Sequence, residues 1–264
     1  MPKKILTTLF FHAGEWEEKQ TNIISEQSIG LTVNGETWLT FMCTPTDLEA
    51  LAIGFLFNEE IIETMDQVAS VRVCPEETNI DVWLNHSVRK PENWIRTTGC
   101  SGGETSRGII TSAGDKIVPP IVVELSAERV GALIDLLSEV QELYRESGGV
   151  HTSALSDGES ILIAAEDIGR HNTLDKIAGR YIMEKITPAR KIILTTGRIS
   201  SEMIQKAGRI GAGVVISRTS PSSLSVQMAD EMGITLIGYA RRDRFTIYAH
   251  PEGILSVPKL SIKK

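Results

Sequence analysis

Residues 191–217 read KIILTTGRISSEMIQKAGRIGAGVVIS, and the expected architecture follows from them. The stretch begins with a short apolar run at 191–195, continues with a helical pattern from about Ser200, and closes with a second apolar run at 213–217. Short apolar runs that alternate with helices are typical of parallel strands buried on both faces of a sheet. The stretch therefore predicts a largely parallel sheet with helices on both sides.

The same alternation continues on either side of this stretch. Further strands are predicted at 160–165 and 234–239, a strand at 245–248 is expected to return antiparallel, and helices are expected from about Asn172 and from Ser220-Pro221. Proline favours the first turn of a helix, which supports the last of these assignments. Upstream, the spacing of apolar residues predicts one long amphipathic helix that begins at Ser126 and stops at Gly148-Gly149.

The first part of the chain has a β-rich pattern. Two strand-like runs, 29–33 and 37–41, flank Asn34-Gly35-Glu36, which is a strong hairpin signal. A capping box at 46–49 predicts a helix whose buried face carries Leu48, Leu51, Ala52, Phe55 and Leu56, and strands are expected near 71–73 and 80–84. We therefore expect an α/β protein (α+β overall), with a smaller β-rich domain at 1–123 and a three-layer α/β domain at 124–264.

Composition excludes several classes of function. The chain has 264 residues, 41% of them hydrophobic, and a formal net charge of -7, which argues against nucleic acid as a partner. No apolar run is long enough to span a membrane, and the N-terminus lacks the pattern of a signal peptide. Three widely spaced cysteines fit a reducing cytoplasm, and no Cys/His cluster has zinc-site spacing, so no protein-bound metal is expected.

Arginines gather in the loops that follow the predicted parallel strands. These loops contain Arg170, Arg198, Arg218, Arg241, Arg242 and Arg244, together with His171 and Ser220. The carboxyl ends of parallel strands lie at one edge, where open α/β sheets bind ligands, and helix N-termini at that edge favour anions. The set predicts a site for a phosphate-bearing ligand. A single arginine is more often a solvated charge than a ligand contact, so the prediction rests on the whole set. His171 could handle a proton, bind a phosphate or brace a loop.

Cys100 is the candidate for sulfur chemistry. It lies in the polar, glycine-rich segment 97–104, which predicts a thiol presented on a loop. Taken alone, it could also be an incidental loop thiol. Cys43 and Cys74 lie in strand-like runs, and we expect both to be small buried hydrophobic residues.

The sequence resembles the FdhD family, also called FdhD/NarQ, which comprises accessory sulfurtransferases of formate dehydrogenase. Residues 166–176, EDIGRHNTLDK, are similar to the family's E-D-V-G-R-H-N-A-x-D-K signature, which is hard to match by chance. Further blocks match in order, at 44–56, 196–206, 220–224 and 236–241. The resemblance covers nearly the whole chain.

This resemblance implies a function, a fold and several partners. Such proteins take persulfide sulfur from a cysteine desulfurase and pass it to the molybdenum (or tungsten) bis-guanine-dinucleotide cofactor that formate dehydrogenase requires. The resemblance also implies a cytidine-deaminase-like C-terminal fold, a homodimer, and GDP as a possible mimic of the bound cofactor. It assigns cofactor binding to the segment Tyr239, Ala240, Arg241, Arg242, Asp243 and Arg244.

The sequence departs from the family at one position of the reactive loop. Thr98-Gly99-Cys100 matches the first half of the family's T-G-C-x-x-C, but Gly103 stands where the second cysteine is expected. A persulfide carrier needs only one thiolate, so Cys100 remains the predicted catalytic residue. The missing thiol leaves open a chaperone that binds the cofactor without transferring sulfur. A nucleotide hydrolase or deaminase is disfavoured, because the sequence lacks a phosphate-binding G-x-x-x-x-G-K-[ST] loop and zinc-ligand spacing around His151.

Overall fold

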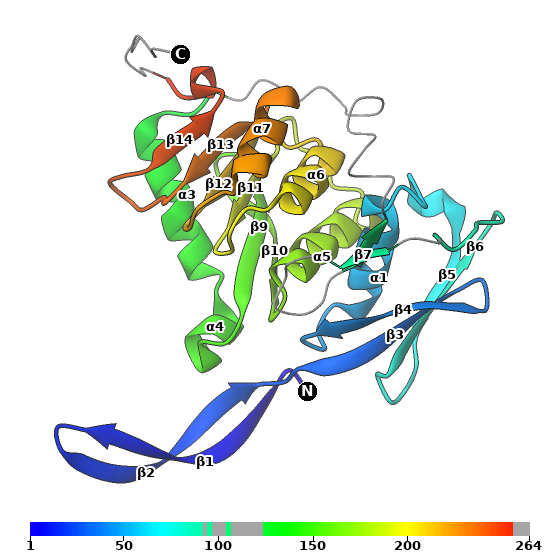
Figure 1. Cartoon of the computed structure of the whole chain (residues 1–264), viewed down its shortest axis with the longest axis horizontal. Coiled ribbons are helices and arrows are strands. Elements are labelled where there is room, and N and C mark those ends of the chain that lie inside the picture. Colours follow the sequence, from blue (N-terminus) through cyan, green and yellow to red (C-terminus); the bar gives the residue numbers. More distant parts are fainter. Residues whose placement is uncertain (92–93, 97–103, 107–123, 256–264) are drawn as a thin grey trace. The chain divides into compact units, whose positions relative to one another are not determined.

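The computed structural model describes residues 1–91, 94–96, 104–106 and 124–255, which belong to two compact units (Figure 1). The units consist of the described residues of these segments: unit 1 of Met1–Thr111, Gln141–Thr152 and Ala165–Lys185, and unit 2 of Ser112–Val140, Ser153–Ala164 and Ile186–Lys264. A single division near residue 123 is expected from the sequence, whereas each unit combines three segments. The difference arises because helix α5 (Arg170–Met183), from the second half, packs against helix α1 (Leu48–Asn58).

Unit 1 is built around a four-stranded sheet and the helix pair α1 and α5. Its other described elements are β1 (Lys3–His12), β2 (Glu15–Ile24), β3 (Gln27–Val33), β4 (Glu36–Cys43), η1 (Met65–Gln67), β5 (Val68–Val73), β6 (Asn79–Leu84), β7 (Trp94–Arg96), β8 (Glu104–Ser106) and α4 (Glu142–Ser147). The four-stranded sheet has the order β4-β3-β6-β5, with β3 antiparallel to β4 and parallel to β6. The pairs β1–β2 and β7–β8 form separate two-stranded sheets.

The hairpin predicted at Asn34-Gly35 is confirmed. Both residues have positive φ, 49° and 83°, as the tight turn between β3 and β4 requires. The Asn34 side chain strengthens the turn, because its amide oxygen accepts a hydrogen bond from the Leu84 N–H of β6 at 2.7 Å. The strands expected near 71–73 and 80–84 are also present, as β5 and β6.

Helix α1 differs from its prediction at its start and around its circumference. The predicted capping box is wrong: the N-cap is Asp47, whose backbone is left-handed (φ 48°) and whose side chain makes no capping hydrogen bond. The Thr46 hydroxyl instead accepts a hydrogen bond from Lys176 Nζ at 3.0 Å, so a tertiary contact replaces the local cap. All residues of α1 except Glu49 are buried, so the helix is enclosed on every side rather than amphipathic.

The backbones of helices α1 and α5 pack directly against each other, and Figure 1 shows the two helices side by side. A Cβ atom placed on Gly54 of α1 would lie 1.7 Å from the Asp175 carbonyl oxygen of α5. A Cβ on Gly179 of α5 would lie 1.9 Å from the Ala50 carbonyl oxygen of α1. Only hydrogen side chains fit at these two positions, so the two glycines set the spacing of the helix pair.

Unit 2 contains most of a six-stranded sheet, which confirms the predicted α/β class. The elements of the sheet and its helices are α3 (Ala127–Glu139), β9 (His151–Ser156), β10 (Ile161–Asp167), β11 (Ile192–Thr195), α6 (Ser201–Ile210), β12 (Val214–Ser217), α7 (Ser223–Glu231), β13 (Thr235–Gly238), β14 (Thr246–Ala249) and η2 (Pro251–Gly253). The strand order is β10-β9-β11-β12-β13-β14, and β11, β12 and β13 are parallel. The antiparallel return predicted near 245–248 is confirmed as β14.

Strand β9 lies inside this sheet and was not expected from the sequence. It runs antiparallel to β11, with Ser153 opposite Thr195. Its sequence, HTSALS, is polar, yet five of its six residues are buried. The hydroxyl groups are satisfied inside the protein: Ser153 Oγ, for example, donates to Thr195 Oγ1 at 2.8 Å.

The core of unit 2 lies between α3 and the sheet. Apolar side chains of α3, among them Leu133 and Leu137, pack with Ile192, Leu194 and Ile216 of the strands. The neighbouring strand residues point to the opposite face and are buried too, because β11, β12 and β13 are buried at every position. The expectation of strands covered on both faces is therefore confirmed.

Two helix boundaries differ from the sequence prediction. The long helix predicted from Ser126 has the expected N-cap, since Ser126 Oγ accepts from Arg129 N–H at 3.2 Å, but α3 ends at Glu139 and α4 begins separately at Glu142. Helix α7 begins at Ser223 rather than at Ser220-Pro221, because Ser222 is the N-cap and accepts from Ser225 N–H at 3.2 Å. Among the described residues, no helix combines the length and apolar character needed to cross a membrane.

The close crossing of α1 and α5 predicts a large effect of one methyl group. Gly54→Ala should lower the free energy of unfolding by about 1–3 kcal/mol, because the added methyl meets a backbone carbonyl that cannot rotate away. Urea denaturation followed by circular dichroism measures this. The matched control is Gly208→Ala in α6, where the close contact is with the flexible end of Met232 and Ile234 Cδ1 is at an ordinary 3.7 Å. Equal unfolding midpoints for the two variants would contradict the proposed spacing role.

Candidate functional site

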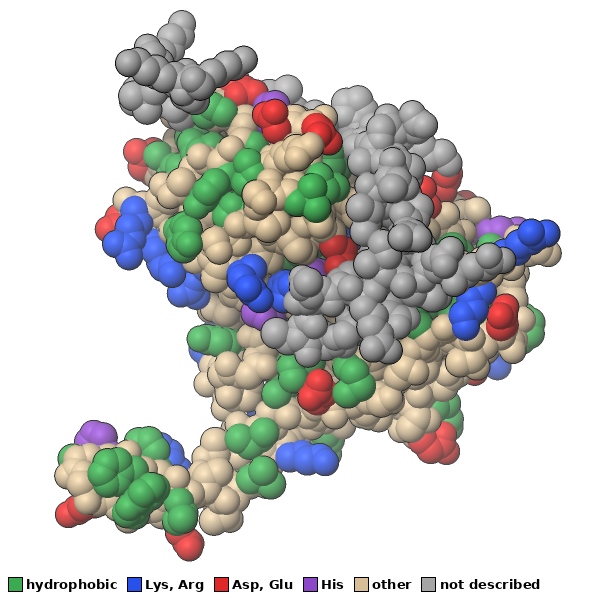
Figure 2. Space-filling view, viewed as in Figure 1, with side chains coloured by type: hydrophobic (Ala, Val, Ile, Leu, Met, Phe, Trp, Pro, Cys, Tyr) green, Lys and Arg blue, Asp and Glu red, His purple; other side chains and the backbone are tan. Residues whose placement is uncertain are grey.

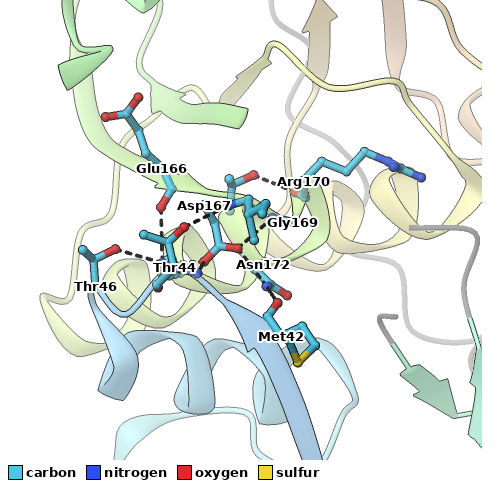
Figure 3. Close-up of polar contacts among 11 residues, drawn as sticks. Met42, Thr44, Thr46, Glu166, Asp167, Gly169, Arg170 and Asn172 are labelled. Atoms are coloured by element: carbon cyan, nitrogen blue, oxygen red, sulfur yellow. Dashed lines mark hydrogen bonds and ion pairs between the residues drawn. The ribbon is translucent and has the colours of Figure 1, made fainter. Parts of the chain in front are cut away.

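The segment 166–176 forms a buried polar network at the end of β10 and the start of α5 (Figure 3). Its centre is an ion pair between Lys176 Nζ and Asp167 Oδ2, which are 2.7 Å apart. Both side chains are fully buried, with 0% exposure. Figure 3 shows Asp167 between the strand end and the β4–α1 connection that carries Thr44.

Hydrogen bonds satisfy both charged groups of this pair. The Lys176 ammonium donates to the Thr44 carbonyl oxygen at 3.1 Å, to Thr46 Oγ1 at 3.0 Å and to the Glu166 carbonyl oxygen at 3.2 Å. Asp167 accepts from Thr44 N–H, from Gly169 N–H and from Asn172 Nδ2, at 3.1, 2.8 and 2.9 Å. A buried charge with this many partners is stable where it lies, so the pair joins two connections of unit 1.

Glu166, the residue before Asp167, caps a different helix. Its carboxylate accepts from the Leu143 N–H at 2.6 Å and from the Tyr144 N–H at 3.1 Å, the first turn of α4. Free N–H groups at a helix N-terminus favour a carboxylate. The Thr152 hydroxyl donates to the same carboxylate at 3.1 Å. The Glu166 carboxylate therefore caps α4 as a helix of its own, which explains why residues 126–148 do not form one helix.

Arg170 and His171 lie in the first turn of α5, two residues earlier than the predicted helix start. Their exposures are 5% and 3%, so they are buried, whereas an edge site would present them to solvent. Figure 3 shows the Arg170 side chain extending away from the Asp167 network. Both residues belong to unit 1, and their contribution to a cofactor site stays a prediction.

The carboxyl ends of β11, β12 and β13 meet at one edge of the sheet of unit 2, as predicted. Hydrogen bonds join the loops that follow these strands: Ser217 Oγ donates to the Gly197 carbonyl oxygen at 2.7 Å, and Tyr239 N–H donates to the Thr219 carbonyl oxygen at 2.9 Å. The first turns of α6 and α7 leave from the same loops, with Ser200 and Ser222 as N-caps. The edge therefore has a fixed backbone and two helix N-termini.

The predicted residues of unit 2 differ in exposure at this edge. Exposed side chains belong to Arg198, Tyr239, Arg242, Asp243 and Arg244; partly exposed ones belong to Arg218, Ser220 and Arg241; Ala240 is buried. Arg241 braces the backbone, because its Nη1 donates to the carbonyl oxygens of Arg218 and Ala240, both at 2.7 Å. Arg242 forms an ion pair with Asp135 of α3. The role of the exposed arginines in binding an anion stays a prediction.

Tyr239 has a left-handed backbone, with φ of 51°, and its side chain is 52% exposed. A residue other than glycine rarely adopts this conformation, and strain of this kind concentrates at functional positions. The preceding Gly238 packs against the Thr219 backbone, where a Cβ would lie 2.9 Å from the carbonyl oxygen. The family resemblance names Tyr239, whereas its left-handed backbone was not predicted from the sequence.

Cys100 and Gly103 lie outside the described residues, so the predicted catalytic position is known from the sequence alone. Cys43 is buried as expected, and burial, with a smaller effect of the Asp167 charge, raises the pKa of its thiol to about 12. Cys74 was expected to be buried as well, and this expectation is wrong. It lies at the turn after β5, where it is partly exposed and held by Thr78.

The Cys74 sulfur takes part in three hydrogen bonds. They come from the Thr78 hydroxyl at 3.4 Å and from the N–H groups of Thr78 and Asn79, both at 3.2 Å. These donors, the Thr78 hydroxyl first, lower the pKa of the Cys74 thiol below its usual value. Among the described residues, no group of three or more His, Cys, Asp or Glu side chains is arranged to hold a metal ion.

The structural role of segment 166–176 was not predicted from the sequence. Its polar residues suggested a ligand loop, whereas Asp167, Asn172 and Lys176 are buried and bonded to the β4–α1 connection. A signal was present in α5: Arg170 to Gly179 are all buried although most are polar, and a helix with so few apolar residues needs internal polar partners. Those partners lie 123 and 132 residues away along the chain, so the local sequence does not identify them.

The fold and this edge define the class: a mixed α/β protein whose parallel strands end in arginine-bearing loops. The chain belongs to the FdhD/NarQ family, whose model matches residues 24–255. Two relatives from Staphylococcus aureus, strains MRSA252 and Newman, carry the name sulfur carrier protein FdhD. Each is 34% identical over 235 residues, which cover 88% of this chain and 89% of the relative.

A solved structure has a similar fold. It is described as a formate dehydrogenase accessory protein from Desulfotalea psychrophila and has a TM-score of 0.80 with 25% sequence identity. The match covers 97% of this chain and 100% of the other. The family resemblance seen in the sequence is thus confirmed by the family model and by the relatives.

The buried ion pair predicts unequal effects of two substitutions in α5. Lys176→Met should lower the free energy of unfolding by about 3–5 kcal/mol, because it leaves the Asp167 carboxylate buried without its cation. Arg180→Met, one turn later, removes a partly exposed pair with Glu184 and should cost about 0.5 kcal/mol or less. Chemical denaturation of both variants makes the comparison. Similar losses for the two would show that the buried pair does not anchor the network.

The environment of Cys74 predicts a pH-dependent reactivity that distinguishes the two described thiols. Alkylation requires the thiolate, so Cys74 should react at lower pH than an ordinary thiol, and Cys43 should stay unmodified across the same range. Thr78→Val should move the Cys74 alkylation midpoint to higher pH, because it removes the hydroxyl that stabilises the thiolate. Peptide-resolved mass spectrometry after iodoacetamide treatment measures each site. An unchanged midpoint in Thr78→Val would refute this cause.

Proposed function

We propose that this chain is a sulfur carrier that serves formate dehydrogenase. In this proposal it accepts persulfide sulfur from a cysteine desulfurase on Cys100, in the reducing cytoplasm, and delivers the sulfur to the molybdenum (or tungsten) bis-guanine-dinucleotide cofactor. The cofactor is cargo rather than a resident group. The protein acts as a homodimer, as the family resemblance implies.

The observation that carries this proposal is the family match, which spans residues 24–255 and so includes position 100. Relatives that share 34% of their residues with this chain are named as sulfur carriers. The structural neighbour is described as an accessory protein of formate dehydrogenase. The blocks at 44–56 and 166–176, which match the family, form one buried network, so the framework that goes with this function is intact.

The proposed chemistry at Cys100 needs one thiolate. The Cys100 thiolate attacks the terminal sulfur of the desulfurase persulfide, and the desulfurase cysteine leaves as a thiolate. Cys100 then carries the persulfide and gives up its terminal sulfur at the cofactor. Of the other two cysteines, Cys43 is a poor substitute because it is buried with a pKa near 12. Cys74 is a partly exposed thiol, but it lies outside the segment 98–103 that matches the family's cysteine loop.

The arginine-bearing edge of unit 2 supports the assignment of cargo binding. Guanine dinucleotide carries phosphate groups, which arginine binds through paired N–H donors. Arg198, Arg242 and Arg244 are exposed at strand ends, beside the helix N-termini of α6 and α7. In the proposal these arginines hold the phosphates, and Tyr239 lies against the nucleotide.

A second candidate function is a cofactor chaperone that binds the guanine-dinucleotide form without carrying sulfur. Gly103 favours it, because the family's second loop cysteine is missing. The two functions make the same use of the arginine edge. They differ only in whether Cys100 becomes a persulfide.

Sulfur loading separates the two functions. Incubation with a cysteine desulfurase and radiolabelled cysteine should leave a label on the wild-type chain that dithiothreitol removes, because the label is a persulfide. Cys100→Ala should lose this label. Non-reducing electrophoresis with autoradiography measures both.

The matched control is Cys74→Ala, which removes a described thiol and should keep full loading. A Cys100→Ala chain that carries as much label as the wild type would refute the carrier role of Cys100. A wild-type chain that binds GDP but never acquires label would favour the chaperone.

A further inference from the structure

The loop between β13 and β14, residues 239–245, is held near both of its ends, and we call it the arginine loop. Ala240 is fully buried in the core that α3 forms with the sheet, and Phe245 packs against the same core. Between them, the Arg241 N–H donates to the Arg244 carbonyl oxygen at 2.8 Å. Figure 2 shows Lys and Arg side chains gathered where Figure 1 places this loop. The loop therefore presents its charges from a fixed backbone.

Helix α3 contacts the arginine loop at two positions that are one turn apart. Gly131 and Asp135 are separated by four residues, so they lie on the same side of the helix. A Cβ atom on Gly131 would lie 2.0 Å from the Arg242 carbonyl oxygen and 2.9 Å from its carbonyl carbon. Asp135 forms an ion pair with the Arg242 guanidinium. Both contacts are made to one residue of the loop, the first to its backbone and the second to its side chain.

The contact at Gly131 fixes how closely the arginine loop approaches α3. Glycine is unfavourable inside a helix, where alanine is the better residue, so Gly131 brings no local advantage to α3. Its advantage is tertiary, because any larger side chain would push the Arg242 backbone away from the helix. Arg242 and Arg244 both extend from this backbone. The missing side chain at position 131 therefore sets where their guanidinium groups lie.

The contact at Asp135 has the opposite consequence for an anionic ligand. The Arg242 side chain is 80% exposed and that of Asp135 is 37% exposed, so a ligand can reach the pair. A phosphate group would compete with the Asp135 carboxylate for the guanidinium N–H donors, and the two negative charges would repel each other. Exposed ion pairs are weak, so this competition lowers the affinity for the ligand only modestly.

We propose that α3 sets the affinity of the arginine loop for a phosphate-bearing ligand through two contacts of opposite effect. Gly131 is a positioning residue, which strengthens binding because it holds the Arg242 backbone in place. Asp135 weakens binding because it competes for the Arg242 side chain. This inference rests on the proposed function, since it takes the arginine edge as the site of the guanine nucleotide.

Isothermal titration calorimetry of the full chain with GDP tests the proposal. Gly131→Ala should weaken GDP binding on the order of tenfold, because a displaced loop loses the geometry that paired N–H donors require. Asp135→Asn should strengthen GDP binding by about two- to fivefold, the range expected when a surface ion pair no longer competes. If α3 were merely a structural support, neither substitution would strengthen binding.

Two controls show whether the effect of Asp135→Asn passes through Arg242. Glu128→Gln removes the same charge from α3, but Glu128 bonds to Ser126 at the start of the helix, so the GDP affinity should stay within about twofold of the wild type. In an Arg242→Met background, Asp135→Asn should lose most of its effect, because the side chain for which it competes is gone.

The outcomes separate this inference from the proposed function. Arg244→Met should weaken GDP binding if the nucleotide lies at the arginine edge. A wild type that binds no GDP, or an Arg244→Met chain that binds it as tightly as the wild type, would contradict the cargo site at this edge and this inference with it.

Other results would overturn the inference alone, with the cargo site intact. They are a folded Gly131→Ala chain that binds GDP as tightly as the wild type, and an Asp135→Asn chain that binds it no more tightly. An Asp135→Asn effect that persists in the Arg242→Met background would overturn it too. Circular dichroism shows whether Gly131→Ala folds. If it does not, the Asp135 and Arg242 variants decide the proposal, because these side chains are at least partly exposed.

Discussion

The buried pair of Lys176 and Asp167 is the central constraint on unit 1. Removing two charges from water costs several kcal/mol per ion, and their mutual attraction offsets that cost only when hydrogen bonds satisfy the remaining groups. Here three oxygens complete the shell of Lys176, and three N–H donors complete that of Asp167. The β4–α1 connection and the start of α5 are therefore fixed to each other, and the close helix crossing at Gly54 and Gly179 follows from that attachment.

The polar groups of unit 2 are of two kinds. Those inside the sheet, such as Ser153, Thr195 and Ser217, are buried and hydrogen-bonded to one another or to loop carbonyls, so they give the strand ends a rigid backbone. Those beyond the strand ends, including Arg198 and Arg244, project into solvent. A rigid frame that carries exposed cations is suited to recognising a phosphate-bearing molecule, because little conformational freedom is lost on binding.

The sequence predicts elements whose cause is local. Apolar runs separated by helices identify β11, β12 and β13, and Asn34-Gly35 identifies the hairpin, because strand burial and turn geometry act over a few residues. Serine and threonine are hard to interpret from sequence, because their hydroxyls bond to whichever partner the fold supplies. Thr46 accepts from Lys176 instead of capping α1, and Thr152 donates to Glu166 from a strand that the sequence did not predict. The arginine edge was predictable from strand order, whereas the role of Cys100 comes from family resemblance alone.

The segments of unit 1 alternate along the chain with those of unit 2, so unit 1 cannot be completed early in synthesis. Thr44 and Thr46 leave the ribosome more than a hundred residues before Lys176, their partner in the buried network. During that interval, helix α1, which is apolar on every side, lacks the helix that covers it. Unit 1 can close only after α5 has been synthesised, so its early segment must wait with apolar surface exposed. The nascent chain is therefore most vulnerable to aggregation before its residue 185 emerges, and a chaperone that binds apolar segments would act in that window.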